Sequence, residues 1–138
     1  MPDRPDPSTG DPFEGAPVIF SYTRAQAIAD GVLIDLTEWA AETGFRYPVA
    51  CTAALWNEYI VPCEDLRPLG QSERGRAHDL LWTLFVAIRR STGRQDTIHF
   101  ETLLLTTPQR RVTARLKAVC GPGDDGEPVL TIMLPDED

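Results

Sequence analysis

The spacing of apolar residues changes once along this chain of 138 residues, from a helical period to the period of a strand. Between Ser72 and Gly93, large apolar residues recur three, four and seven positions apart, as on one face of an α-helix. Beyond Gly93, alternate residues are apolar, as in strands with one buried face. These patterns predict an α+β domain in which one long amphipathic helix packs on an antiparallel sheet of three or four strands formed by the C-terminal third. The helical pattern comprises Ala77, Leu80, Leu81, Leu84, Phe85 and Ile88.

The last third contains three alternating runs, separated by residues that favour turns. Their apolar positions predict the register of the first hairpin. We expect Leu104 opposite Val112 and Phe100 opposite Leu116, because a shift by one residue would place Lys117 against the core.

The N-terminal half predicts short elements. A helix is expected over residues 23–31, where Gln26 completes a capping box with Thr23. A short strand or an extended buried link is expected over residues 32–36. A second short helix, capped by Thr37, is expected over residues 37–44, and a third over residues 52–60. These helices would pack with the long helix on the sheet.

The chain organisation predicted is one domain over residues 18–138, with an acidic C-terminal end and a short strand at residues 18–20. Residues 1–17 contain five prolines and a single large apolar side chain, so we expect a flexible arm there. No apolar run is long enough to span a membrane, and no leader segment is recognisable. The three cysteines, Cys51, Cys63 and Cys120, lack the spacing of a zinc site or redox motif, and we expect buried or half-buried thiols in a cytoplasmic protein.

The formal net charge is −8, but its sign varies along the chain. From residue 74 to residue 117, basic residues outnumber acidic ones by nine to three, whereas the last 21 residues carry six acidic residues and no basic one. Two candidate binding surfaces follow. The basic candidate comprises Arg110, Arg111, Arg115 and Lys117, and the acidic candidate comprises Asp124, Asp125, Glu127, Asp136, Glu137 and Asp138.

Catalytic chemistry finds little support in the residues. His99 shares a strand face with Glu101 and Arg115, which would allow acid–base catalysis, but a solvated ladder of charge pairs explains the same pattern better. The turn at residues 123–127 lacks the alternating acids of a calcium loop, and no glycine-rich phosphate loop is present. We therefore predict no enzyme activity, no metal site and no cofactor.

Two kinds of binding remain open. The basic hairpin could contact nucleic acid, although a net acidic molecule starts at a disadvantage there. The acidic segments could instead imitate a phosphate backbone and occupy the nucleic-acid channel of another protein. Plain solubility is the simplest alternative for the acidic segments.

Two stretches carry a resemblance to known sequences. SYTRAQAIADGVLIDLT (residues 21–37) and KAVCGPGDDGEPVLTIMLP (residues 117–135) resemble a family of small uncharacterised proteins of bacterial plasmids, phages and integrated elements. The resemblance implies an accessory gene of mobile DNA. The expected function is then a non-catalytic inhibitor, of the anti-CRISPR or anti-restriction kind, that binds a host protein complex; the alternative is a nucleic-acid-binding factor that uses the basic hairpin.

Overall fold

The structure is a computed structural model that describes residues 22–93 and 96–138. The flexible arm predicted for residues 1–17 and the strand predicted for residues 18–20 lie outside the described residues. The elements in chain order are α1 (Arg24–Ala29), β1 (Leu33–Asp35), α2 (Thr37–Thr43), β2 (Val49–Thr52), α3 (Ala53–Leu55), η1 (Trp56–Ile60), η2 (Glu64–Leu69), α4 (Glu73–Arg90), β3 (Thr97–Thr107), β4 (Arg110–Pro122) and β5 (Pro128–Met133).

The sheet has five strands in the order β1-β2-β5-β4-β3. All neighbours are antiparallel except β2 and β5, which run parallel. The α+β class is confirmed, but the prediction of a purely antiparallel sheet of three or four strands from the C-terminal third was wrong. Strand β2 was not predicted because Val49, Ala50 and Cys51 are all buried, so its sequence shows no alternation of apolar and polar residues.

The long β3–β4 hairpin has the predicted register, with Leu104 opposite Val112 and Phe100 opposite Leu116. One face of it is buried, including Phe100, Leu104 and Leu116. On the other face, Arg115 Nε lies 3.4 Å from Glu101 Oε2, as the shared parity of these residues implied. The alternation of apolar residues was therefore sufficient to fix this pairing.

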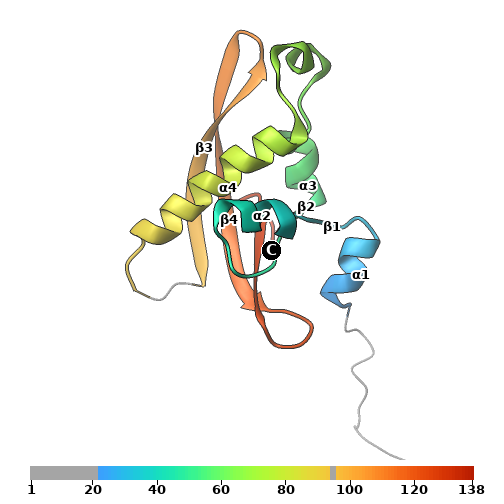
Figure 1. Ribbon diagram of the computed structural model, residues 1–138, viewed down its shortest axis with the longest axis vertical. Helices are drawn as coiled ribbons and strands as arrows, with labels where there is room; N and C mark the ends of the chain where they lie inside the picture. Colours follow the sequence, from blue (N-terminus) through green and yellow to red (C-terminus); the bar gives the residue numbers. More distant parts are fainter. Residues whose placement is uncertain (1–21, 94–95) are drawn as a thin grey trace, which may run out of the picture.

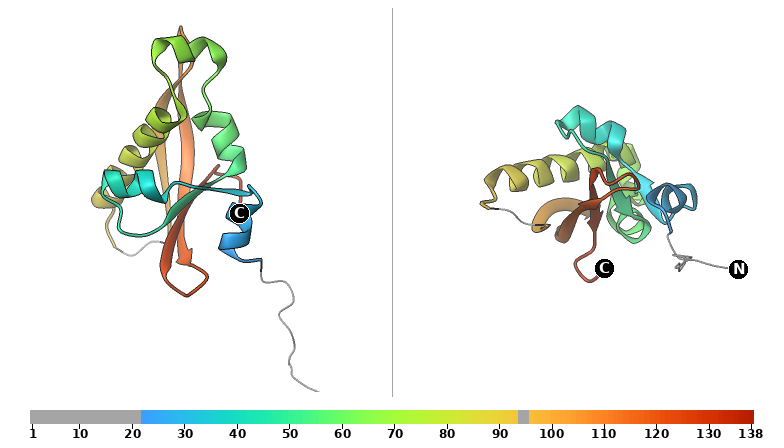
Figure 2. Two further views of the ribbon diagram at one scale, coloured as in Figure 1. Left: turned by 45° about the vertical axis from the view of Figure 1, so that its right-hand side comes forward. Right: turned by 90° about the horizontal axis from the view of Figure 1, so that it is seen from below.

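Helix α4 crosses one face of the sheet, with α2 beside it (Figures 1 and 2). It begins at the predicted cap, where Ser72 Oγ accepts a hydrogen bond from Gly75 N. Leu80, Leu81 and Leu84 are fully buried in the core under the helix. The C-terminal residues lie on the opposite side of the sheet from α4 (Figure 2).

The short helices match their predictions to different degrees. The capping box of α1 is confirmed at Thr23 and Gln26. In α2, Leu36 rather than Thr37 occupies the cap position, because the carboxylate of Asp35 accepts hydrogen bonds from both the N–H and the hydroxyl of Thr37. The third helix begins at its threonine cap but widens after three residues into η1, a π-helix.

The cysteines are unpaired thiols, of which Cys51 is buried while Cys63 and Cys120 are exposed. The expectation of burial is confirmed for Cys51 alone. Among the described residues, 22–93 and 96–138, no helix has both the length and the apolar character needed to cross a membrane.

Candidate functional site

A groove of about 450 Å³ opens at one end of the sheet, between the second half of α4 and the loop that joins α2 to β2. We call it the aromatic groove. Ile98, Cys120 and Leu130 line its strand side, on the same face of the sheet as the core. The helix and loop contribute the rest of the lining, namely Gly44, Phe45, Arg46, Tyr47, Phe85, Ile88 and Arg89.

The groove exists because the apolar face of α4 extends beyond the part of α4 that α2 covers. Phe85 and Ile88 belong to the predicted helical stripe, yet they are only half-buried. Helix α2 ends too early to cover them, at Gly44, which has a positive φ of 124°. A Cβ atom at Gly44 would lie 3.2 Å from the ring of Phe85, so the loop approaches α4 closely only because this residue is glycine.

Aromatic rings form one wall of the groove. The rings of Phe45 and Phe85 meet edge to face with centroids 5.5 Å apart, and Trp82 stacks on Phe85 at 5.9 Å. The guanidinium carbon of Arg89 lies 5.8 Å from the centroid of Phe85. These contacts hold the wall in place while Trp82 and Tyr47 remain 54% and 52% exposed.

Positive charge borders this apolar surface. Arg46 and Arg89 are exposed, and neither forms an ion pair with any residue that the structure describes. Interface centres in proteins are enriched in aromatic residues and arginine. The aromatic groove therefore fits a partner segment that offers an apolar side chain beside carboxylates.

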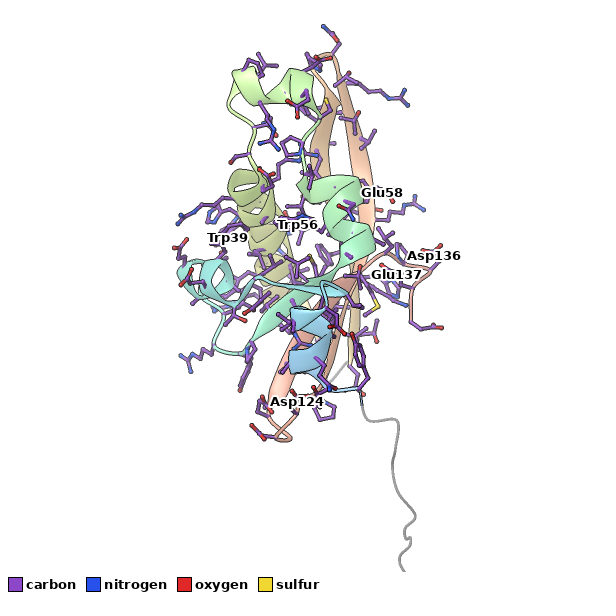
Figure 3. The ribbon with its side chains drawn as sticks, turned by 90° about the vertical axis from the view of Figure 1, so that its right-hand side faces the viewer. Trp39, Trp56, Glu58, Asp124, Asp136 and Glu137 are labelled. Atoms are coloured by element: carbon purple, nitrogen blue, oxygen red, sulfur yellow. The ribbon has the colours of Figure 1, made fainter. Side chains whose placement is uncertain are left out.

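The acidic candidate residues are divided between two places and are partly occupied. Asp124 lies in the β4–β5 turn, well apart from Asp136 and Glu137 on the C-terminal segment (Figure 3). Both carboxylate oxygens of Asp124 accept hydrogen bonds from the first turn of α1, from Arg24 N at 2.7 Å and Ala25 N at 3.0 Å. Asp124 therefore acts as a cap for α1, supplied from a distant part of the chain.

Two of the glutamates also have partners within the fold. Glu127 Oε1 accepts a hydrogen bond from Asp125 N inside the β4–β5 turn. Glu137 Oε2 accepts from Thr52 Oγ1 at 2.7 Å and from Leu134 N at 2.8 Å. The side chains of Asp125, Asp136 and Asp138 form no hydrogen bond or ion pair with the described residues, and all three residues are exposed.

The basic candidate residues do not gather into one stripe. Arg110 and Arg111 are exposed at the turn of the β3–β4 hairpin, well apart from the C-terminal end of α4 (Figure 1). Arg115 pairs with Glu101, and Lys117 Nζ donates a hydrogen bond to the main-chain oxygen of Glu137. Among the four basic candidates, Arg110 and Arg111 are the two whose side chains have no hydrogen-bond or ion-pair partner within the described residues.

Two further hollows contain polar side chains of the kinds used in catalysis. One of about 470 Å³ lies over His99, Glu101, Arg115 and Pro135, where Glu101 is engaged by Arg115. A larger hollow of about 600 Å³ lies between α2 and the start of α4. Arg74 Nη2 and Glu42 Oε2, 2.8 Å apart, form an ion pair across it. Trp39 lies on its wall and stacks on Trp56 (Figure 3). Within the described part of the chain, no cluster of three or more His, Cys, Asp or Glu side chains could hold a metal ion.

Comparison with known sequences gives a family. The model of DUF6573, a family of unknown function, matches residues 10–138. The chain belongs to this family. No curated protein and no solved structure matches it. Membership of DUF6573 agrees with the expected resemblance to an uncharacterised family and assigns no site, so the geometry of this DUF6573 protein has to carry the functional argument.

The aromatic groove was not predicted from the sequence. The signals were present in the Phe45-Arg46-Tyr47 triplet, which follows a helix stop, and in Trp82, which falls outside the apolar stripe of α4. A tryptophan at a solvent-facing helical position and two aromatic rings around an arginine are typical of a contact surface. Their convergence could not be foreseen, because it depends on how α2 packs beside α4, which the spacing of residues along the chain does not show.

Proposed function

We propose that this DUF6573 protein is a non-catalytic accessory protein that binds another protein through the aromatic groove. The observation that carries the proposal is the combination of an apolar hollow, a fixed aromatic wall and, at its rim, the exposed residues Arg46 and Arg89, which form no ion pair with the described residues. Its partner is an acidic segment with a large apolar side chain. Burying such a side chain contributes about 1.5–3 kcal/mol, and the arginines select for the neighbouring carboxylates.

The proposed biological role is inhibition of a host defence system, of the CRISPR or restriction kind, by a protein of mobile DNA. Support comes from the resemblance of residues 21–37 and 117–135 to proteins of plasmids and phages. An inhibitor of this kind acts by occupying a surface and needs no catalytic residues. The aromatic groove provides such a surface, whereas the acidic candidate residues are divided and partly used within the fold.

Nucleic-acid binding is the second candidate, since Arg110 and Arg111 are exposed at the hairpin tip. Trp82 and Tyr47 could stack on bases, as in single-strand-binding proteins. Such proteins combine stacking with a continuous basic groove, but here Arg110 and Arg111 lie at the turn of the β3–β4 hairpin, whereas Ile98 and Cys120 of the aromatic groove lie at its other end. Protein binding therefore accounts better for the arrangement.

Phage plating on a host with an active CRISPR or restriction system tests the role. Expression of the full chain should raise plating, and Tyr47→Ala with Arg89→Glu should remove the effect. The matched control is Arg110→Glu with Arg111→Glu, which alters charge at the other end of the molecule and should retain full activity. Unchanged plating on every host with such a system would refute the inhibitor role.

Binding itself can be tested by cross-linking from a photoreactive amino acid at position 47. A cross-link should form within an acidic segment of a defence protein and disappear in the Arg89→Glu variant. If the chain instead shifts single-stranded nucleic acid in a gel, and the Arg110→Glu, Arg111→Glu variant abolishes the shift, the nucleic-acid alternative replaces the proposal.

A further inference from the structure

Strand β3 forms one edge of the sheet, and β4 is its only neighbour within the described sheet. It is 11 residues long, which is long for an unprotected edge. Natural edge strands are commonly blunted by lysine, proline or a bulge. Strand β3 contains neither lysine nor proline, and its single irregularity lies near its end, between Leu105 and Thr107.

The hydrogen bonds show which backbone groups this edge presents. Cys120 N donates to Asp96 O at 2.7 Å, so the pair of residues 96 and 120 is a hydrogen-bonded pair of the antiparallel ladder. Such pairs alternate along a ladder. Thr97, His99, Glu101 and Leu103 therefore direct both N–H and C=O away from β4. The next outward carbonyl, that of Leu105, is occupied by Arg76 Nη1 at 2.9 Å, which closes the free edge at Leu103.

The outward backbone groups of these four residues match those of a second β3 strand. When two β3 strands run antiparallel about a twofold axis at Phe100, Thr97 faces Leu103 and His99 faces Glu101. Every outward residue then meets an outward residue of the other copy, and each pair exchanges two N–H···O=C bonds. No outward group of the four is left over.

Charge selects this register over its neighbours. Centring the pair on Glu101 would place two carboxylates directly opposite each other, and centring it on His99 would set Glu101 opposite Thr97 in place of His99. A centre at Thr102 would pair His99 with Leu105, whose carbonyl already accepts from Arg76. The centre at Phe100 instead sets His99 against Glu101 twice, once on each side of the axis.

We propose that β3 pairs with β3 of a second copy of this chain, antiparallel about Phe100, to give a homodimer with a continuous sheet. The side chains of His99, Glu101 and Leu103 lie on the face that α4 does not cover, and Leu103 is 57% exposed in the single chain. Next to the edge, α4 presents the short side chain of Thr83, whose Oγ1 lies 3.3 Å from Thr102 Oγ1. The proposal does not rest on the proposed function of the aromatic groove, which adjoins the paired segment at Ile98.

Sedimentation analysis of the full chain tests the dimer, with circular dichroism to confirm folding of each variant. Wild type should sediment with twice the monomer mass. His99→Glu places a carboxylate opposite Glu101, and Glu101→Lys removes the carboxylate that faces His99, so each should weaken dimerisation by about tenfold or more. The matched control is Thr113→Glu, which adds a carboxylate to the same face of the sheet on β4, away from the edge, and should leave the dimer unchanged.

Mixing gives the decisive measurement. A copy with His99→Glu and a copy with Glu101→Lys complement each other at both charge pairs, so native mass spectrometry should show the heterodimer in excess over either homodimer. A monomeric wild type would overturn the proposal. So would a dimer that tolerates both substitutions and shows no preference for the mixed pair.

Discussion

At the residue scale, Asp124 joins two parts of the molecule that lie about a hundred positions apart in the sequence. Its carboxylate accepts hydrogen bonds from the first turn of α1, where free N–H groups and the helix dipole favour a negative charge. We expect Asp124→Ala to lower the free energy of unfolding by about 1 kcal/mol, measured by urea denaturation. The neighbouring Asp125→Ala removes an exposed carboxylate from the same turn and should cost far less; equal losses would contradict the capping role.

The thiol of Cys51 is closed to solvent, and burial, reinforced by the charge of Glu137, raises its pKa to about 12. Thiol reagents react with the thiolate, so at pH 8 the folded protein should react at Cys63 and Cys120 alone. Cys51 should react only in denaturant, as followed by mass spectrometry after alkylation. Reaction of all three thiols at equal rates in the folded protein would refute this.

The same pKa shift has a consequence for stability. A thiol whose pKa is higher in the folded state ionises at a lower pH in the unfolded chain than in the folded protein. Its contribution to stability is therefore complete below the pKa of the unfolded chain and is lost as pH rises toward about 12. The free energy of unfolding should therefore decline in alkaline solution. In a Cys51→Ala variant this part of the decline should be absent.

At the element scale, Arg76 of α4 connects its helix with η1, with β3 and with the loop before α4. Its guanidinium donates to Tyr59 O in η1, to Gln71 Oε1 before α4 and to Leu105 O in β3. The residue is 3% exposed, and burial lowers its pKa.

We expect Arg76→Met to destabilise the fold by about 2–4 kcal/mol, because it leaves buried carbonyl oxygens without donors. Arg74→Met, two residues earlier on α4, removes only the exposed ion pair with Glu42 and should cost less than about 1 kcal/mol. Thermal unfolding of the two variants side by side measures the difference. Similar melting temperatures would show that Arg76 is dispensable.

Elements defined by interactions between residues close in the sequence could be predicted, and those defined by pairing of distant residues could not. Helix α4 and the β3–β4 hairpin could be predicted because Ser72 and the apolar parity are local signals. The pairing of β2 with β5 could not, because Cys51 meets Ile132 across 81 positions and neither strand alternates clearly. Phe85 and Ile88 were predicted as core residues, yet they are only half-buried. The helical pattern shows which residues are apolar, but it does not show how far the neighbouring helix extends over them.

At the scale of the whole molecule, the N-terminal elements depend on the C-terminal strand. Strand β5 lies between β2 and β4, so it joins the N-terminal pair of strands to the long hairpin. Helix α1 depends on the same region, because the Arg24 guanidinium donates to Leu130 O and Thr131 Oγ1, both at 2.8 Å. The N-terminal elements therefore have no sheet to complete until the C-terminal strand is in place.

A chain that ends after Glu127 should consequently lose cooperative folding as a whole and not merely its last strand. In the full chain, fluorescence of Trp39, Trp56 and Trp82 reports on the helical layer, while far-ultraviolet circular dichroism also reports on the sheet. Because β5 couples the two, both signals should follow one urea transition, whereas the shortened chain should show no cooperative transition. Removal of Asp138 alone is the matched control and should preserve the transition. Separate midpoints for fluorescence and dichroism in the full chain would show that the hairpin and the N-terminal elements fold independently.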